Sequence, residues 1–346
     1  MKFFSKKYML FIIAFSLAYM PVEPLVPHAN AKKYKVTIEK ISHNKDKVSK
    51  ARQLTVQEQH ARDLGEFYDG SSKPNLSSSK ALIVNQTTGE IKYAKNSSAV
   101  APIASITKLM TAMVVLDAKQ SFDETIRITN QEVDTIKNTW SSLKVGTTLR
   151  RSKVFQLALM ASENRAAYAL ASNYPGGKKA FVKAMNKKAV ALGLTHTNFS
   201  GPTGLMYQNT STAEDLYKLV AAAYQYPEIR KATTRQDFQV HLKGNENPTK
   251  YKNTNKLVRK DEWDIGLSKT GFIDEAGRCL VMQATVDGEP IIAVFLDAED
   301  SNKRTGDVIR IRKWIEYNHR HDSKVVVAKQ QQGLQPKLVM SERIWN

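Results

Sequence analysis

Apolar side chains follow Pro102 at intervals of three and four residues, which is the spacing of one helix face. They are Ile106, Leu109, Met110, Met113 and Val114. Few polar residues interrupt this stretch, so we predict a helix that is mostly buried. Pro102 lies just ahead of it, where the missing N–H of a proline costs little. Ser105 falls in the first turn, and Lys108 lies three residues later on the same face.

The rest of the pattern predicts strands near both ends of the chain and helices between them. We expect strands at 81–84, 90–94, 265–272, 278–286 and 290–296, the last two joined by a turn at Asp287-Gly288. We expect further helices at 152–161, 165–173, 178–192, 213–226 and 303–317. The predicted fold class is therefore α+β. A five-stranded antiparallel sheet, built from both chain ends, is flanked by helices and has a helical lobe beside it.

The first 31 residues have the pattern of a cleaved secretory signal peptide, with an uncleaved anchor as the alternative. Lysines precede an apolar run from Tyr8 to Met20, and Ala29-Asn30-Ala31 supplies a cleavage site. Residues 32–79 read as a basic, polar extension and linker, with at most partial helix at 56–64. We expect the folded domain at 80–318 and a C-terminal tail at 319–346.

The chain is strongly basic. Its formal charge of +19 becomes +17 without the signal peptide, which carries three lysines and one glutamate. Nucleic acid is a common partner of such chains, but export argues against it and we see no nucleic-acid motif. Anionic cell wall or membrane surface is a more suitable partner, and a charged surface without any partner stays open. We expect no integral membrane segment after removal of the signal peptide.

Several residues that could carry other chemistry lie in poor contexts. Cys279 is the only cysteine, and its place in a predicted strand favours a buried, inert thiol. His319 and His321 could bind a metal, but a solvated tail explains them better, and His196 is a weak cleft candidate. The chain has no Gly-x-Ser-x-Gly motif. We expect no metal and no cofactor.

Ser105 and Lys108 are candidates for nucleophilic catalysis. Desolvation in a dry cleft lowers the pKa of a lysine, and the neutral amine can then accept the proton of a serine hydroxyl. The backbone N–H of Ser105, free at the helix start, can point at an oxyanion. The alternative is a helix cap followed by a lysine that reaches solvent.

Two further motifs favour the catalytic interpretation. Ser162-Glu163-Asn164 follows an apolar run, and Lys269-Thr270-Gly271 lies in a predicted strand. In the order Ser-x-x-Lys, Ser-x-Asn and Lys-Thr-Gly, the three motifs form the signature of penicillin-binding proteins and class A β-lactamases. A turn at a helix end or a charge on an edge strand explains each motif alone, but not their order.

The three motifs suit acyl transfer through a serine ester. We expect Ser105 to attack a carbonyl and Lys108 to accept its proton. Ser162 can pass a proton to the leaving amine, and Asn164 can hold Lys108 or the substrate amide.

The strand motif suits the binding of a carboxylate. Lys269 can attract that carboxylate and help to keep Lys108 neutral, and Thr270 can donate a hydrogen bond to it. Gly271 would let the substrate lie against the strand, and the N–H of Phe272 can join the oxyanion hole. Arg304 is a candidate for a second carboxylate-binding cation.

From about Lys80 to Asn318 the chain resembles the low-molecular-mass penicillin-binding proteins, the serine D-Ala-D-Ala carboxypeptidase family. Residues 101–111, 198–205 and 269–271 carry this resemblance. Residues 160–167 and 269–282 are most similar to its D-Ala-D-Ala endopeptidase branch, the penicillin-binding protein 7 type, which cuts D-Ala–diaminopimelate cross-links in peptidoglycan. The chain departs from many relatives at Glu163, where they carry Gly or Asp.

The resemblance implies the transpeptidase/β-lactamase-like fold and a single soluble domain in the periplasm. It also implies peptidoglycan stem peptides and cross-links as substrates, and β-lactams as covalent inhibitors. Three alternatives stay open: a D-Ala-D-Ala carboxypeptidase that trims pentapeptides, a β-lactamase, and a non-enzymatic basic envelope-binding protein. No Glu-x-x-x-Asn stretch follows Asn164 at the distance that class A β-lactamases use, so we expect slow deacylation.

Overall fold

The computed structural model describes residues 55, 58, 61, 62, 64–242, 244–260 and 262–331, without the side chains of 323–331. The signal-peptide prediction, most of the predicted extension and the end of the predicted tail lie outside these residues. No helix in the described part is both long and apolar enough to cross a bilayer.

A five-stranded antiparallel sheet joins the two ends of the described chain, which confirms the predicted fold class. Its strands are β1 (Lys80–Asn85), β2 (Ile91–Lys95), β9 (Asp264–Ile273), β10 (Gly277–Val286) and β11 (Glu289–Ala298). They lie in the order β2-β1-β11-β10-β9. β9, which carries Lys269-Thr270-Gly271, is therefore an edge strand, and one side of that motif is left for other groups.

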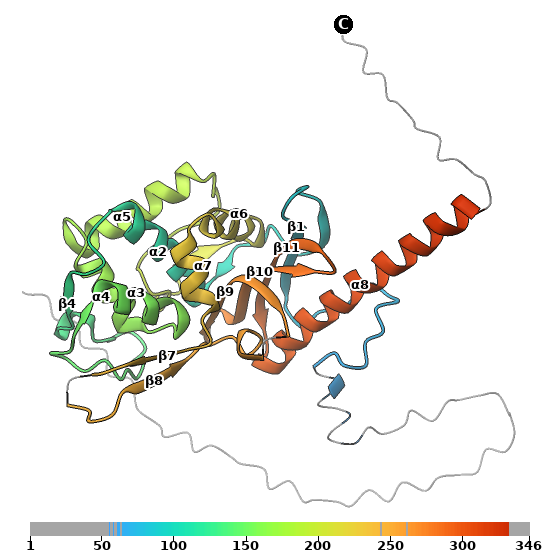
Figure 1. Cartoon of the computed structure of the whole chain (residues 1–346). Helices are drawn as coiled ribbons and strands as arrows, with labels where there is room; N and C mark the ends of the chain where they lie inside the picture. Colours follow the sequence, from blue (N-terminus) through green and yellow to red (C-terminus); the bar gives the residue numbers. More distant parts are fainter. Residues whose placement is uncertain are drawn as a thin grey trace, which may run out of the picture. The chain divides into compact units, whose positions relative to one another are not determined.

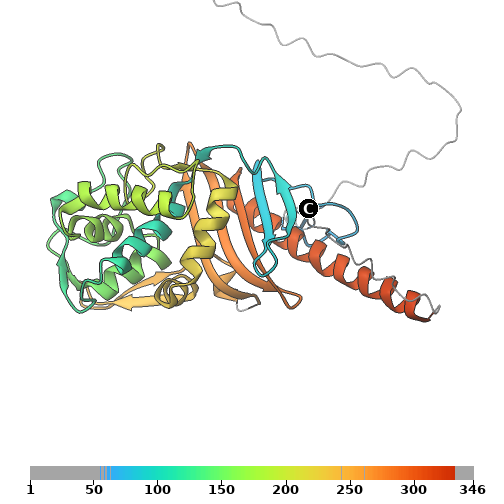
Figure 2. The ribbon, with the colours of Figure 1, turned by 90° about the horizontal axis from the view of Figure 1, so that it is seen from above.

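The sheet is covered on both faces, so its strands are almost continuously apolar. Leu82 and Val84 point into one core, while Ala81 and Ile83 point into the other, as the two-residue period of a strand requires. Helix α6 (Ala213–Tyr224) packs in the first core. Helix α8 (Ser301–Gln331) packs in the second, on the far side of the sheet (Figures 1 and 2).

A helical lobe lies beside the sheet (Figure 1). It is formed by α2 (Lys108–Asp117), α3 (Arg151–Met160), α4 (Asn164–Ser172) and α5 (Gly177–Ala191), close to the predicted ranges. Elements that the pattern did not predict are α7 (Pro227–Thr234) and the short pairs β3 (Ala101–Pro102) with β6 (Thr210–Ser211), β4 (Thr125–Arg127) with β5 (Thr148–Arg150), and β7 (Asp237–Val240) with β8 (Thr249–Lys252).

The start of the central helix differs from the prediction. Pro102 belongs to β3, a 3₁₀ turn η1 spans Ala104–Thr107, and α2 begins only at Lys108. A 3₁₀ turn has three residues per turn, so side chains three positions apart eclipse each other. Ser105 and Lys108 therefore share a face, as predicted, but through a tighter turn than an α-helix.

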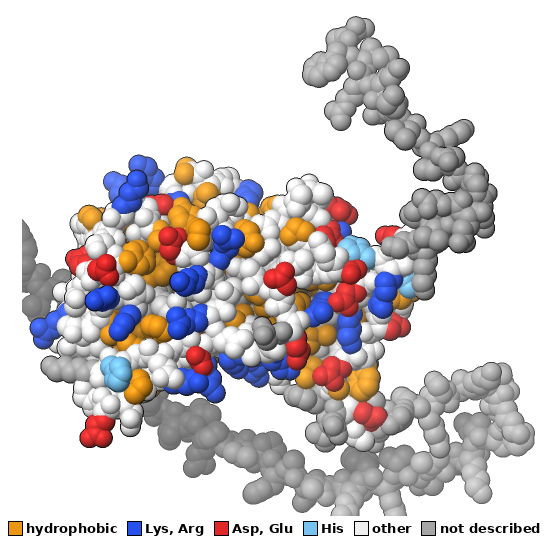
Figure 3. Space-filling view, in the orientation of Figure 1, with side chains coloured by type: hydrophobic (Ala, Val, Ile, Leu, Met, Phe, Trp, Pro, Cys, Tyr) orange, Lys and Arg blue, Asp and Glu red, His pale blue; other side chains and the backbone are white. Residues whose placement is uncertain are grey.

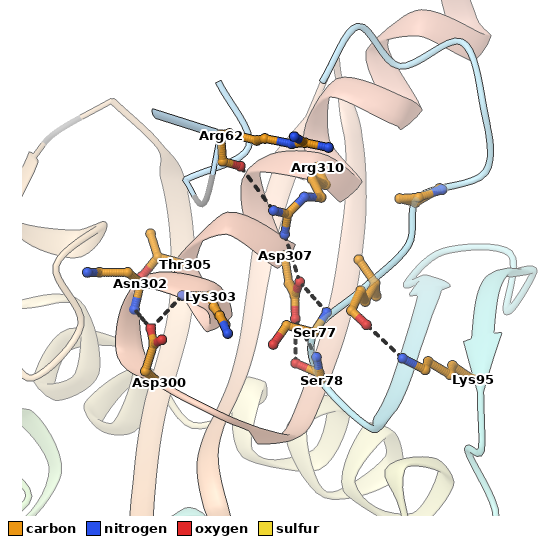
Figure 4. Close-up of polar contacts among 12 residues, drawn as sticks. Arg62, Ser77, Ser78, Lys95, Asp300, Asn302, Lys303, Thr305, Asp307 and Arg310 are labelled. Carbon is orange, nitrogen blue, oxygen red and sulfur yellow. Dashed lines mark hydrogen bonds and ion pairs between the residues drawn. The ribbon is translucent and has the colours of Figure 1, made fainter. Parts of the chain in front are cut away.

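Residues ahead of β1 dock on α8, although the folded domain was expected to begin at Lys80. Asp307 of α8 is fully buried and accepts hydrogen bonds from the backbone N–H groups of Ser77 (2.8 Å) and Ser78 (2.7 Å). Arg310 donates to Asp307 (3.1 Å) and to the carbonyl of Arg62 (3.1 Å), as Figure 4 shows. The carboxylate of Asp307 thus holds this segment to the helix.

Candidate active site

Ser105 and Lys108 are in direct contact. The Nζ of Lys108 lies 2.7 Å from the Oγ of Ser105, 2.8 Å from the Oδ1 of Asn164 and 2.8 Å from the carbonyl oxygen of Thr203. The Lys108 side chain is completely buried. The alternative was a helix cap followed by a lysine that reaches solvent, and it does not apply to Lys108 because this side chain is buried.

The backbone around Ser105 is held by close packing. Ala104, which precedes the serine, has a positive φ of 45°, a conformation that costs a non-glycine residue energy. Gly204 lies directly against it, because a β-carbon at Gly204 would stand 1.8 Å from the carbonyl oxygen of Ala104. The loop that carries Thr203 therefore both fixes the turn before Ser105 and supplies a carbonyl to Lys108.

Lys108 has the pKa of a usable base. Burial lowers its pKa from the ordinary value of 10.5 to about 7, and the charge of Glu163 opposes this by favouring the ammonium form. At neutral pH a substantial fraction of the amine is thus neutral and can accept the proton of Ser105.

Glu163 is the residue at which the chain departs from many relatives. Its side chain caps α4 by accepting a bond from the backbone N–H of Arg165. Burial raises the pKa of its carboxyl group, which a hydrogen bond from Ser141 partly offsets. Glu163 therefore places a largely buried acid close enough to Lys108 to raise the pKa of that lysine.

Ser162 and Lys269 form the second contact of the site. The Nζ of Lys269 donates to the Oγ of Ser162 (2.8 Å) and to the carbonyl of Thr270 (2.9 Å). Lys269 is buried, and its pKa is lowered well below the ordinary value, first by burial and then by repulsion from Lys108 and Arg304. We predicted that Lys269 helps to keep Lys108 neutral. The structure assigns that effect chiefly to the burial of Lys108 itself.

Gly271 has a structural role that the sequence did not indicate, and its predicted role toward substrate stays a prediction. A β-carbon there would lie 3.0 Å from the carbonyl oxygen of Ile103 and 3.1 Å from the backbone nitrogen of Ser105. Gly271 thus lets the turn that carries Ser105 approach β9. This approach brings the N–H of Ser105 next to the strand whose following residue, Phe272, was predicted to complete the oxyanion hole.

The remaining predicted side chains lie along β9. Thr270 donates a hydrogen bond to the hydroxyl of Thr254 (2.7 Å), a partner that the sequence did not indicate. Phe272 is exposed on 45% of its surface and stacks under the guanidinium of Arg278. Arg304 is buried at the start of α8, donates to the carbonyl of Cys279 (3.2 Å) and is close enough to Lys269 to lower its pKa.

One group of residues escaped the sequence analysis. Asp134 accepts bonds from the N–H of Ile136 (2.8 Å) and from both the N–H and hydroxyl of Thr139 (2.9 and 2.7 Å). The hydroxyl of Thr139 in turn accepts a bond from Asn164 (3.0 Å), which holds Lys108. Residues 134–139 therefore form a wall of the site. Asp134, followed by polar turn residues, was the signal that could have revealed it.

This wall meets the end of the β9–β10 turn. Lys137 forms an ion pair with Glu275 (2.6 Å), so a salt bridge connects the loop after β4 to the strand that carries Lys269.

The other sequence candidates lie apart from these contacts. Cys279 is buried, and burial raises the pKa of its thiol to about 11, as expected of an inert cysteine. His196 contacts Thr195 and Asp215, while His319 pairs with Asp287 and Glu289. Among the residues that the structure describes, no three or more His, Cys, Asp or Glu side chains are grouped as a metal site would need.

Comparison with known proteins agrees with this geometry. A family model described as D-alanyl-D-alanine carboxypeptidase, peptidase family S11, matches residues 68–300. A D-alanyl-D-alanine endopeptidase of Pseudomonas aeruginosa is 46% identical over 241 residues, which cover 70% of this chain and 78% of that protein. A D-alanyl-D-alanine endopeptidase of Escherichia coli is 45% identical over 250 residues, covering 71% and 79%.

Solved structures share the fold. The Streptomyces K15 DD-transpeptidase superposes with a TM-score of 0.66 at 28% identity, covering 70% of this chain and 98% of that one. Penicillin-binding protein D2 of Listeria monocytogenes, solved in its cefotaxime-bound form, gives a TM-score of 0.60 at 29% identity, covering 71% and 98%. The chain belongs to the D-alanyl-D-alanine carboxypeptidase family of serine peptidases, peptidase family S11.

Proposed function

We propose that this protein is a D-Ala-D-Ala endopeptidase that cuts D-Ala–diaminopimelate cross-links of peptidoglycan through an acyl-enzyme on Ser105. The observation that carries the chemistry is the 2.7 Å contact between the hydroxyl of Ser105 and the buried Nζ of Lys108, whose pKa is lowered to about 7. The endopeptidase specificity is supported by the relatives that are 45–46% identical and are named endopeptidases.

Acylation begins when the neutral amine of Lys108 takes the proton of Ser105. The Oγ of Ser105 attacks the D-Ala carbonyl carbon, and the N–H groups of Ser105 and Phe272 stabilise the oxyanion. Lys269 and Thr270 hold the carboxylate next to the scissile amide. These contacts orient the carbonyl toward Ser105.

The leaving amine then needs a proton. Ser162, hydrogen-bonded to Lys269, lies in position to pass one on, and the C–N bond breaks to leave an ester on Ser105. Lys108 then acts as the base for a water molecule that attacks this ester. This step releases the D-Ala carboxylate and restores the serine hydroxyl. The net reaction is hydrolysis of one amide, in which no oxidation state changes.

The proposed location is the periplasm. The apolar run and cleavage site in residues 1–31 support export. On the face shown in Figure 3, Lys and Arg side chains are interspersed with Asp and Glu. That distribution suits a charged soluble surface that meets anionic wall polymer.

The test is digestion of purified muropeptides by the mature protein. Cross-linked tetrapeptide dimers should be cut to monomers, and Ser105→Ala should abolish the cutting. Ser152→Ala, an exposed serine of α3, is the matched control and should cut normally. If monomeric pentapeptides were trimmed while dimers stayed intact, the protein would instead be a carboxypeptidase. That activity is the second candidate, because the family model that matches bears this description.

A fluorescent penicillin separates the remaining alternatives. The wild-type band should stay labelled through electrophoresis, and Ser105→Ala should be unlabelled. Rapid turnover of the drug would indicate a β-lactamase. Unlabelled wild-type protein that binds cell wall would indicate a non-enzymatic envelope-binding protein.

A further inference from the structure

The salt bridge between Lys137 and Glu275 joins the wall of the site to the β9–β10 turn. Lys137 belongs to the wall that holds Asn164, and its Nζ lies 2.6 Å from the Oε1 of Glu275. The two side chains are 29% and 37% exposed, so a ligand can reach the pair. Their hydrogen bond raises the pKa of Lys137 and lowers that of Glu275, and the charges of nearby acids act on Lys137 in the same direction. Both partners are therefore charged at neutral pH.

The backbone of β9 shows which of its groups a substrate can meet. The carbonyl of Ile273 accepts a hydrogen bond from the N–H of Ala276 (3.1 Å), and Ile273 pairs with Gly277 of β10. The backbone groups of Ile273 therefore point toward β10. Consecutive residues of a strand direct these groups to opposite edges, so the N–H and the carbonyl of Phe272 point to the open edge of the sheet. This is the orientation that the proposed oxyanion hole requires.

The open edge of β9 sets the direction of the substrate. In the proposed mechanism the carboxylate beside the scissile amide lies at Lys269, and the D-Ala carbonyl lies at the N–H of Phe272. The leaving part therefore extends toward the start of β9, and the stem that becomes the acyl group, the donor stem, extends toward its end. The donor-stem residue before D-Ala lies about 3.4 Å further along, where β9 ends at Ile273 and the turn begins. The donor stem thus runs toward the Lys137–Glu275 pair.

Diaminopimelate is the donor-stem residue before D-Ala in the proposed substrate. One end of this residue is built into the peptide, and its other end is an amino acid with an ammonium group and a carboxylate. The cross-link uses the second amino group of the acceptor stem, so the same group of the donor stem stays free. A zwitterion of this kind matches a lysine–glutamate pair, because head-to-tail docking gives each of the four charges two opposite neighbours.

We propose that the Lys137–Glu275 pair binds the free amino-acid end of the donor-stem diaminopimelate, with the ammonium group on Glu275 and the carboxylate on Lys137. This inference deepens the proposed function and rests on it. The salt bridge does not have to break, and Asp274 beside Glu275 adds negative charge for the ammonium group. Because the site lies on the acyl side, it acts on cross-linked dimers and monomeric pentapeptides alike. It selects the chemistry of the stem, whatever the leaving group is.

The test changes the substrate and the pair separately. In the purified cross-linked tetrapeptide dimer the donor stem holds the free amino group, so acetylation removes this ammonium charge. Acetylation should lower the kcat/KM of wild type about three- to tenfold, as expected for a charged hydrogen bond that is partly open to solvent. Glu275→Gln should lose about as much on the unmodified dimer, and acetylation should change its kcat/KM by less than about twofold.

Lys137→Gln tests the other half of the site. It should keep the sensitivity to acetylation, and it should lose the sensitivity to amidation of the free carboxylate at the same end of diaminopimelate. A matched control is Asp117→Asn, which removes a 2.7 Å ion pair with Lys188 between α2 and α5. This control should respond to acetylation within about twofold of wild type. Labelling by fluorescent penicillin reports that the serine centre of each variant is folded.

The outcomes separate this site from the proposed function. Equal sensitivity to acetylation in wild type and Glu275→Gln, or a wild type that cuts both dimers equally well, would overturn the proposal. The same measurements are made on the monomeric pentapeptide, which has the same donor stem. If wild type trimmed the pentapeptide but cut no dimer, the endopeptidase function would fail. An acetylation effect on the pentapeptide that Glu275→Gln abolishes would still support the donor-stem site.

Discussion

Replacing Glu163 by glutamine should shift the pH dependence of Ser105 acylation toward acid. Acylation requires the neutral amine of Lys108, so its rate rises as the pH rises through the pKa of that lysine. Burial lowers this pKa to about 7, while the negative charge of Glu163 raises it. Removing the charge lowers the pKa further, and the rising limb of the profile moves to lower pH.

The size of the shift follows from the charge pair. A nearby opposite charge shifts a pKa by about one to three units, and the charge of Glu163 is a smaller cause than burial for the pKa of Lys108. We therefore expect a shift of about one to two units when this charge is removed. At pH 6, about a tenth of Lys108 is neutral in wild type, so the variant should acylate roughly five to ten times faster. At high pH the variant should be no faster, because a weaker base removes the proton less well.

The assay is the second-order rate of acylation by a β-lactam between pH 5 and 9. Glutamine can still accept the capping bond from Arg165, so the fold should be retained, and thermal unfolding checks this. The control is Glu275→Gln, which removes an acid from the β9–β10 turn. Its acylation rate should rise over the same pH range as that of wild type. If the acylation rate of Glu163→Gln rose over the same pH range as that of wild type, or over a higher one, the reasoning would be refuted.

Three further predictions concern packing. Gly204→Ala should abolish penicillin labelling, because its β-carbon would stand 1.8 Å from the carbonyl oxygen of Ala104 and its φ is +83°; normal labelling would show that the turn before Ser105 tolerates displacement. Asp307→Asn should destabilise the protein by about 2–4 kcal/mol, since it weakens buried bonds to Ser77 and Ser78. The midpoint of thermal unfolding should then fall by about 5–10 °C, and an unchanged midpoint would contradict the docking role of Asp307. The thiol of Cys279, buried and with its pKa raised to about 11, should react with an aromatic disulfide at pH 8 only after unfolding; fast reaction of the native protein would contradict its burial.

The sequence alone determined the elements that follow from local rules. The apolar runs determined the strands of the sheet, and the helix expected at 213–226 begins at Ala213 in the structure, capped by Thr212. Asp287 and Gly288 both adopt positive φ, as the predicted two-residue turn requires. The three motifs also supplied the candidate reacting side chains, because their residue types and order are typical of serine acyl transfer. Local pattern missed α7 and the wall around Asp134, where polar turn residues dominate and periodicity is weak.

Only the tertiary structure decided which groups these side chains contact and how strongly their pKa values shift. Lys108 meets Asn164 and Thr203 across 56 and 95 positions of sequence, and no local pattern specifies such contacts. Its pKa depends on how completely the packed chain removes water, so burial could be postulated from the sequence but measured only in the fold. The packing role of Gly271 could not be predicted for the same reason, because only the folded chain brings Ile103 and Ser105 against β9. Sequence periodicity reports which face of an element is apolar, whereas desolvation and close approach depend on which distant segment covers that face.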